Sequence, residues 1–219
     1  MTGAAATAAT GDSAAASTPS TGTWVFVCGP SGSGKDSVIR WAQQALQDRI
    51  DIVFSRRYIT RAVHTGSDHD PVSHADFEKL LQSGALRWHW TAHGFSYGIG
   101  QHYQGDSDAG KVVVINGSRE HVQELFGSPH LRVVQITADS TALVQRLKAR
   151  GRDTAEAVVQ RLERNTAFRD LACDLLIAND TRPAHAGRQL SDYLVSAAAE
   201  METDVGLVTA KRAFSSSAS

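Results

Sequence analysis

An apolar run at residues 24–28, Trp-Val-Phe-Val-Cys, is followed at once by Gly29-Pro30-Ser31-Gly32-Ser33-Gly34-Lys35-Asp36-Ser37. Five consecutive apolar residues predict a strand that is buried on both faces, as in a parallel sheet. Beyond the glycines, apolar residues recur at helical spacing and predict a helix with one apolar face: Val38, Ile39, Ala42 and Leu46. The sequence therefore predicts a strand, a glycine-rich loop and a helix in that order.

The glycine-rich loop has the composition of a phosphate-binding loop. Its glycines allow the backbone to curl, so that several N–H groups point at one anion, and the helix N-terminus adds partial positive charge. Lys35 supplies a point charge that reaches the β- and γ-phosphates of a nucleotide. We therefore expect residues 29–37 to hold the phosphates of a nucleotide. The alternative at this point is a Gly/Ser-rich surface turn that joins a strand to a helix.

The residue after the lysine is unusual. Phosphate loops normally have Ser or Thr there, with the hydroxyl on Mg²⁺, whereas this chain has Asp36 and then Ser37. Asp36 either ligates Mg²⁺ directly or through water, or is an acidic first-turn residue that leaves Ser37 to reach the metal. Both residues are candidate metal ligands.

Composition divides the 219 residues into three parts. Residues 1–22 are nearly all Ala, Thr, Ser and Gly, which predicts a disordered tail. Residues 23–199 are long enough for one domain with a substantial core. Residues 200–219 are expected to form a loose C-terminal tail.

Strand and helix patterns alternate through this domain, which predicts an α/β fold with a parallel sheet covered by helices. Further core strands are expected at residues 52–54, 111–115, 131–137 and 175–178. Helices are expected at residues 73–82, 139–148 and 154–169 and from about residue 181 through Tyr193. Residues 86–91 and 95–97 are expected to form two short antiparallel strands.

Charge and cysteine content exclude several classes of protein. A net charge of −1 argues against a general binder of nucleic acid or membrane surfaces, and no apolar run is long enough to span a bilayer. Cys28 and Cys173 lie in apolar, strand-like segments, which favours buried thiols in a reducing cytoplasm over a disulfide. The oligomeric state stays open.

A basic segment follows the second predicted strand. Arg56, Arg57 and Arg61 lie close to Tyr58, and guanidinium groups suit phosphate oxygens. Beside a phosphate loop, they indicate capture of a second phosphorylated molecule; the alternative is a solvated basic strand.

A second arginine-rich region begins at Arg146 and includes Arg150 and Arg152 around the hinge-like Gly151. Arginines that close over a transferring phosphoryl group neutralise its oxygens and exclude water, which predicts a lid at about residues 146–165. The alternative is that about half of these arginines lie on a charged helix face, where nearby carboxylates balance them.

Five segments resemble guanylate kinases, in order: residues 29–35, Tyr58-Ile-Thr-Arg61, His93-Gly94 with Tyr97-Gly98, Arg146-Leu-Lys-Ala-Arg150-Gly151, and Asn179-Asp180. The chain resembles more closely the ribose 1,5-bisphosphate phosphokinase family of phosphonate catabolism. The segments that carry this closer resemblance are Lys35-Asp36-Ser37 with its loop, Arg57-Tyr-Ile-Thr-Arg61, Tyr97-Gly-Ile-Gly100, Val114-Ile-Asn116-Gly-Ser-Arg119 and Arg150-Gly-Arg152. The resemblance covers roughly residues 24–195.

Departures from the guanylate kinase pattern favour the second family. His64 stands where guanylate kinases have a second arginine, and Asp70-Pro71-Val72 lacks their tyrosine. Their guanine-reading glutamate falls on Trp88. Without that carboxylate the N–H groups of guanine would be left unpaired, at a cost of one to several kcal/mol.

The resemblance implies a P-loop kinase with a small antiparallel acceptor-binding subdomain at about residues 55–100. ATP is then the phosphoryl donor and Mg²⁺ the metal, and the small-molecule substrates are ATP and ribose 1,5-bisphosphate. Lys35, Arg146 and Arg150 are the implied catalytic residues, and Asn179 and Asp180 lie near the adenine. The implied acceptor-binding residues are Arg57, Arg61, Tyr97 and Asn116.

Two other functions stay open from the sequence. One is a guanylate or other nucleoside monophosphate kinase. The other is a non-catalytic interaction module with a guanylate-kinase-like fold, although such modules usually lack an intact phosphate loop.

Overall fold

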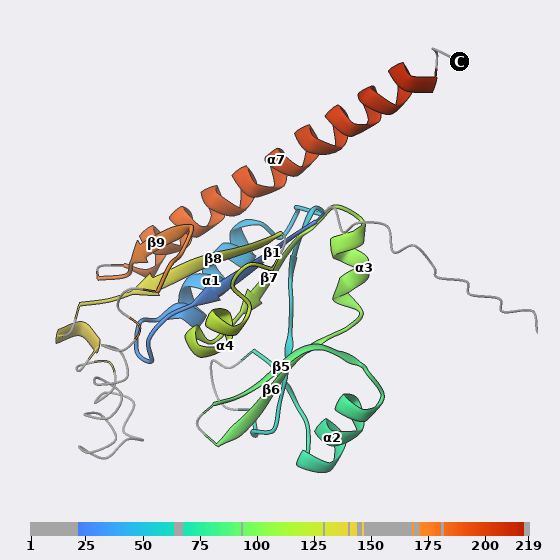
Figure 1. Cartoon of the computed structure of the whole chain (residues 1–219). Helices are drawn as coiled ribbons and strands as arrows, with labels where there is room; N and C mark the ends of the chain where they lie inside the picture. Colours follow the sequence, from blue (N-terminus) through green and yellow to red (C-terminus); the bar gives the residue numbers. More distant parts are fainter. Residues whose placement is uncertain are drawn as a thin grey trace, which may run out of the picture.

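A computed structural model describes residues 22–63, 68–92, 94–128, 130–139, 141–143, 146, 168, 171–180 and 182–216, with side chains up to residue 201. Its core is a five-stranded parallel sheet in the order β2-β7-β1-β8-β9 (Figure 1). The strands are β1 (Thr23–Cys28), β2 (Ile52–Phe54), β7 (Val112–Asn116), β8 (Leu131–Thr137) and β9 (Leu175–Ala178). The predicted parallel α/β fold is confirmed.

A second, smaller sheet has the order β4-β3-β6-β5. Its strands are β3 (Arg57–Ile59), β4 (Asp70–Pro71), β5 (Leu86–Ala92) and β6 (Phe95–Gly100). β6 is antiparallel to both β3 and β5, so the predicted hairpin is confirmed, whereas β3 and β4 are parallel. No strand was predicted at the residues that form β3 and β4.

The helices are α1 (Lys35–Ala45), α2 (His74–Gln82), α3 (Tyr103–Asp108), α4 (Arg119–Glu124) and α7 (Pro183–Ser216). α2 begins where predicted, because the Ser73 hydroxyl accepts a hydrogen bond from the Asp76 amide at 3.0 Å and caps the helix. The short helices α3 and α4 were not predicted. The expected tail at residues 1–22, apart from Gly22, and most of the two helices expected at residues 139–169 lie outside the described residues.

The prediction of a loose C-terminal tail is wrong, because α7 continues to Ser216. The segment after residue 196 is rich in Ala and includes Glu, Met, Leu, Lys and Arg, all of which favour a helix. A helix that is already nucleated extends through such residues at little cost.

β1 is buried along its whole length because both faces of the parallel sheet are covered. On one face, Val25 and Val27 pack with residues of α1 and α7, including Leu190. On the other face, Trp24 and Phe26 pack with α4 and with aromatic residues of the smaller sheet. The second cover is thus largely a sheet, where the sequence had predicted helices.

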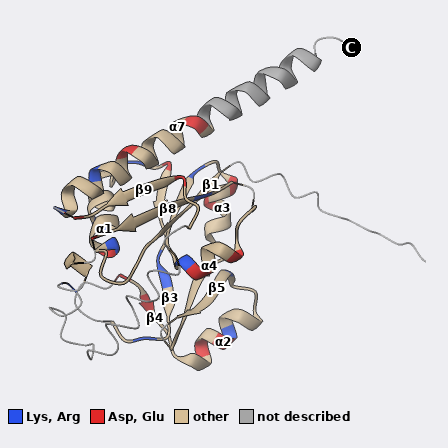
Figure 2. Cartoon of the chain, turned by 60° about the vertical axis from the view of Figure 1, so that its left-hand side comes forward, with Lys and Arg blue, Asp and Glu red and all other residues tan. Residues whose placement is uncertain are grey.

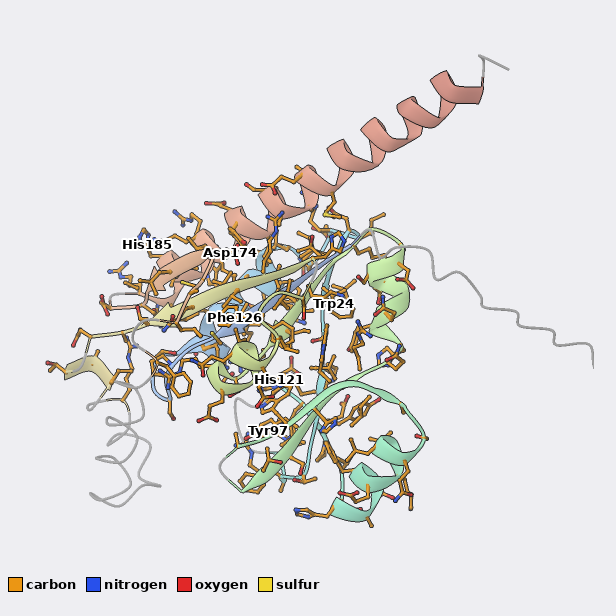
Figure 3. The ribbon with its side chains drawn as sticks, in the orientation of Figure 1. Trp24, Tyr97, His121, Phe126, Asp174 and His185 are labelled. Atoms are coloured by element: carbon orange, nitrogen blue, oxygen red, sulfur yellow. The ribbon has the colours of Figure 1, made fainter. Side chains whose placement is uncertain are left out.

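Aromatic rings fill the space between the two sheets. Trp88 of β5 lies edge-on to Trp24 at 4.5 Å and to Phe26 at 5.2 Å between ring centroids. Trp90 is stacked on Tyr97 of β6 at 5.5 Å and on His121 of α4 at 5.0 Å. Figure 3 shows Trp24, His121 and Tyr97 following one another from the parallel sheet to the hairpin. These contacts hold the smaller sheet against the core.

Leu190 provides a test of this packing. Its side chain is fully buried between α7, to which it belongs, and the parallel sheet, so Leu190→Ala should lower the free energy of unfolding by about 2–5 kcal/mol, measured by urea denaturation. Leu176→Ala is the matched control, because Leu176 is 59% exposed on β9. Equal losses in the two variants would contradict the packing described.

Candidate active site

The glycine-rich loop lies at the carboxyl end of β1, pressed against neighbouring backbone. A Cβ added at Gly29 would lie 2.2 Å from the carbonyl oxygen of Ile136 on β8. Gly34 has φ +80°, and a Cβ there would lie 2.5 Å from Nδ2 of Asn179. The two glycines are therefore required by close approach, and Gly34 also by its left-handed backbone.

Two side chains from later in the sequence hold the glycine-rich loop in place through one carbonyl oxygen, that of Ser33. Asn179 Nδ2 donates to the carbonyl oxygen of Ser33 at 2.7 Å, and Arg146 Nη1 donates to the same oxygen at 3.3 Å. Arg146 Nη2 also donates to the Asn179 carbonyl at 2.9 Å. The structure thus brings the predicted residues Asn179 and Arg146 to the loop, where both support its backbone.

The other predicted ATP-binding residues lie in the loop, in the first turn of α1 and after β9. Pro30 accepts a backbone hydrogen bond from Ser33, and Ser31 and Gly32 form the turn between them. Ser37 is exposed in the first turn of α1. Asp180 accepts from the Asp139 amide at 2.7 Å and so caps the segment that follows β8.

Lys35, Asp36 and Asn116 form a hydrogen-bonded group at the start of α1. Lys35 Nζ donates to Asn116 Oδ1 and lies 3.4 Å from Asp36 Oδ1, and Asn116 Nδ2 donates to Asp36 Oδ1 at 2.7 Å. The charge of Lys35 holds the pKa of Asp36 well below its usual range. Burial lowers the pKa of Lys35, against the opposing charge of Asp36. The β1–β7 register places Asn116 beside Val27, which explains how residues far apart in sequence meet.

The structure separates the three arginines of the basic segment. Arg56 is bonded to carboxylates: it donates to Asp68 at 2.5 Å and to Asp70 at 2.9 Å. Arg56 therefore clamps residues 68–70 to β3, and Figure 2 shows the basic strand β3 beside the acidic strand β4.

Arg57 and Arg61 are held by aromatic rings. The Arg57 guanidinium lies 5.8 Å from the ring centroid of Tyr97, and that of Arg61 lies 5.6 Å from that of Phe95. Within the described ranges neither guanidinium is hydrogen-bonded to a carboxylate, and the buried Nε of Arg61 has no partner. Burial lowers the pKa of Arg57. Such stacked guanidinium groups keep their N–H edges available for an anion.

A pocket joins the phosphate loop to this basic strand. It lies between α1 and the ends of β2 and β7, and its polar lining includes Asp36, Asn116, Ser55, Arg57 and Asp68. Asp36, Arg57 and Asn116 were predicted site residues. Asp68 was not, although it belongs to a polar stretch shortly after Arg61, Gly66-Ser67-Asp68-His69-Asp70.

Other predicted residues lie away from this pocket. Tyr97 is 7% exposed and stacked within the aromatic layer, beneath Arg57. Arg150, Arg152 and His64 lie outside the described residues. Arg119, which the sequence placed only in a resembling segment, is buried at the start of α4 with its guanidinium 4.9 Å from the Phe168 ring centroid.

The thiols take no part in the site. Both cysteines are free, Cys28 buried and Cys173 half-buried. Burial raises the pKa of Cys28 to about 12, so this thiol stays protonated at neutral pH. In the part of the chain that the structure describes, no cluster of three or more His, Cys, Asp and Glu side chains is arranged to hold a metal. No helix in that part is long and apolar enough to cross a membrane.

The chain resembles known proteins both in sequence and in fold. A ribose 1,5-bisphosphate phosphokinase (PhnN) of Acidiphilium cryptum is 43% identical over 169 residues, which cover 77% of this chain and 90% of the relative. The PhnN enzyme of Thiobacillus denitrificans is 37% identical over 181 residues, covering 81% and 95%. The chain belongs to the ribose 1,5-bisphosphate phosphokinase family.

The solved structure of guanylate kinase from Anaplasma phagocytophilum matches the fold of this phosphokinase family member. The TM-score is 0.59 at 18% identity, over 80% of this chain and 85% of the other. The predicted guanylate-kinase-like fold is confirmed. No protein-family model matches the chain.

Gly34 tests the bracing of the loop. Gly34→Ala places a Cβ against Asn179 and should weaken ATP binding about tenfold or more, as measured by calorimetric titration. Gly84→Ala is the matched control: Gly84 has φ +67°, but nothing lies within 4 Å of an added Cβ. A similar loss of ATP affinity in both variants would attribute the effect to general destabilisation and contradict the bracing role.

Proposed function

We propose that the chain transfers the γ-phosphoryl group of ATP to the 1-phosphate of ribose 1,5-bisphosphate, releasing ADP and 5-phospho-α-D-ribose 1-diphosphate. The observation that carries the proposal is the pair Arg57 and Arg61, held by aromatic rings and without carboxylate partners in the described ranges. Arg57 lines a pocket shared with the phosphate loop. The names of the family relatives support the same substrate.

The nucleophile needs no dedicated base. A phosphate monoester has a second pKa of about 6, so an oxygen of the 1-phosphate is already ionised at pH 7. That oxygen forms a bond to the γ-phosphorus while the bond from the γ-phosphorus to the β-bridging oxygen breaks, and the electron pair leaves with ADP. Catalysis is then positioning and electrostatic stabilisation.

Different residues bind the ATP phosphates, the acceptor phosphates and the transferring phosphoryl group. The backbone of residues 29–34 and the ammonium of Lys35 hold the ATP phosphates. Arg57 and Arg61 hold the acceptor by its phosphates, with Tyr97 and Asn116 beside them. Arg146, which already lies against the loop at Ser33, and Arg150 stabilise charge on the transferring group.

The donor set at the start of α1 fits Mg²⁺. Asp36 has an ionised carboxylate with 55% of its side chain exposed, and Ser37 has an exposed hydroxyl one residue later. Mg²⁺ in kinases uses one or two carboxylates together with substrate phosphates, so a larger protein cluster is not required. We assign Asp36 as the protein ligand, direct or through water, with Ser37 as the alternative. Bound Mg²⁺ supplies charge neutralisation at the β- and γ-phosphates.

Trp88 supports a sugar phosphate over a nucleotide as acceptor. The side chain packs edge-on against Trp24 and Phe26 and has no acceptor group for the N–H groups of guanine. A nucleobase at this position would lose hydrogen bonds that it makes in water.

The test of the function is ADP release with alternative acceptors. We expect ATP-dependent ADP release with ribose 1,5-bisphosphate, and at most about 1% of that rate with GMP or with no acceptor. Turnover of GMP at a comparable rate would replace the proposal with a nucleoside monophosphate kinase, and no turnover of either acceptor would favour a non-catalytic module.

The acceptor arginines are tested by removing their charge. Arg57→Met and Arg61→Met should each lower kcat/KM for ribose 1,5-bisphosphate by about 100-fold, because each loses charge-assisted hydrogen bonds to phosphate. Arg87→Met is the control, since the exposed Arg87 also lies over an aromatic ring, at 5.1 Å from Trp88. If Arg87→Met lost as much activity as the other two, the loss would follow from stacking and contradict phosphate binding.

A further inference from the structure

The pocket beside the phosphate loop contains more than cationic groups. Two carboxylates, Asp36 and Asp68, line it together with Arg57. A phosphate has no use for a carboxylate, because both are anionic acceptors at neutral pH. The acceptor molecule therefore needs donors as well as phosphates to suit this lining.

Each of the two carboxylates has one occupied oxygen. Asp36 Oδ1 accepts from Asn116 and lies 3.4 Å from Lys35 Nζ, and Asp68 Oδ1 accepts from Arg56. In the described part of the chain, the Oδ2 atom of each accepts from no residue. Because Asp36 is assigned to Mg²⁺ under the proposed function, Asp68 is the carboxylate of this lining whose second oxygen is left for the acceptor.

Arg56 gives Asp68 a defined position. The same guanidinium donates to Asp68 and Asp70, and it also donates to the His69 carbonyl at 3.3 Å. These three bonds fix the backbone and the carboxylate together beside the pocket. The charge of Arg56 also offsets that of Asp68, which lessens repulsion between this carboxylate and a phosphorylated ligand.

We propose that Asp68 Oδ2 accepts a hydrogen bond from the 2-hydroxyl of the acceptor sugar and so selects ribose over 2-deoxyribose. This assignment rests on the proposed function. The vicinal hydroxyls of ribose 1,5-bisphosphate lie between its two phosphates, and Asp68 lies in the pocket that holds Arg57 and borders Lys35. A carboxylate is acceptor-only, and a hydroxyl that donates to it forms a charge-assisted hydrogen bond. Asp68 is a specificity-determining residue in this assignment and takes no part in the transfer.

The test compares two sugars and two variants. ADP release is measured with ribose 1,5-bisphosphate and with 2-deoxyribose 1,5-bisphosphate, for the wild type, Asp68→Ala and Asp70→Ala. Asp70 is the matched control because it binds the same Arg56 guanidinium but does not line the pocket. The wild type and Asp70→Ala should prefer the ribose substrate by about tenfold or more in kcat/KM. Asp68→Ala should lower kcat/KM for the ribose substrate by a similar factor and leave the deoxy substrate nearly unchanged, so that the preference falls to about twofold or less.

Four results would overturn the assignment. A wild type that uses the two sugars equally, or an Asp68→Ala variant that keeps the full preference, removes the role of Asp68 while the proposed function stands. Loss of preference in Asp68→Ala and Asp70→Ala alike would place the effect in the Arg56 clamp. A wild type without turnover of ribose 1,5-bisphosphate removes the proposed function itself, and the assignment with it. Calorimetric binding of ribose 5-phosphate and 2-deoxyribose 5-phosphate should show the same difference between wild type and Asp68→Ala without any turnover.

Discussion

The Ser33 carbonyl, held by Asn179 and Arg146, is the contact on which the site depends. It joins the loop that follows β1 to the chain that follows β9, across β8. Gly34 has no side chain, so it can adopt a left-handed conformation and leave room for Asn179 Nδ2 where a Cβ would otherwise lie. The loop is thereby preorganised, and a bound phosphate meets N–H groups that need little rearrangement.

The aromatic layer between the two sheets has consequences for both stability and specificity. Trp88, Trp90 and Tyr97 replace the helices that commonly cover the second face of a parallel sheet, and they bring the smaller sheet close to the phosphate loop. In the same arrangement Trp88 turns inward, where it contributes to the core. A position that resembles a base-reading site in guanylate kinases has therefore become part of the packing.

Charge is distributed unevenly along one short basic segment. Arg56 is neutralised by Asp68 and Asp70, whereas Arg57 and Arg61 lie over Tyr97 and Phe95. Arg56 directly precedes β3 and its guanidinium reaches residues 68–70, whereas the guanidinium groups of Arg57 and Arg61 lie over rings of β6. One arginine thus organises the pocket wall, and two remain positioned for an anion.

Much of the fold and part of the site followed from local sequence signals. The strand β1, the glycine-rich loop before Lys35 and the helix α2 each depend on near neighbours, so they were predicted from the sequence alone. The helical C-terminus, the short strand β3 and the cover of the second sheet face were not. The partners of Arg56 lie 12 and 14 residues away, and the partner of Lys35 lies 81 residues away. Only the tertiary structure decided three features: which arginine is neutralised, which carboxylate faces the pocket and what Asn179 supports. Each of these features depends on contacts between segments that are far apart in the sequence.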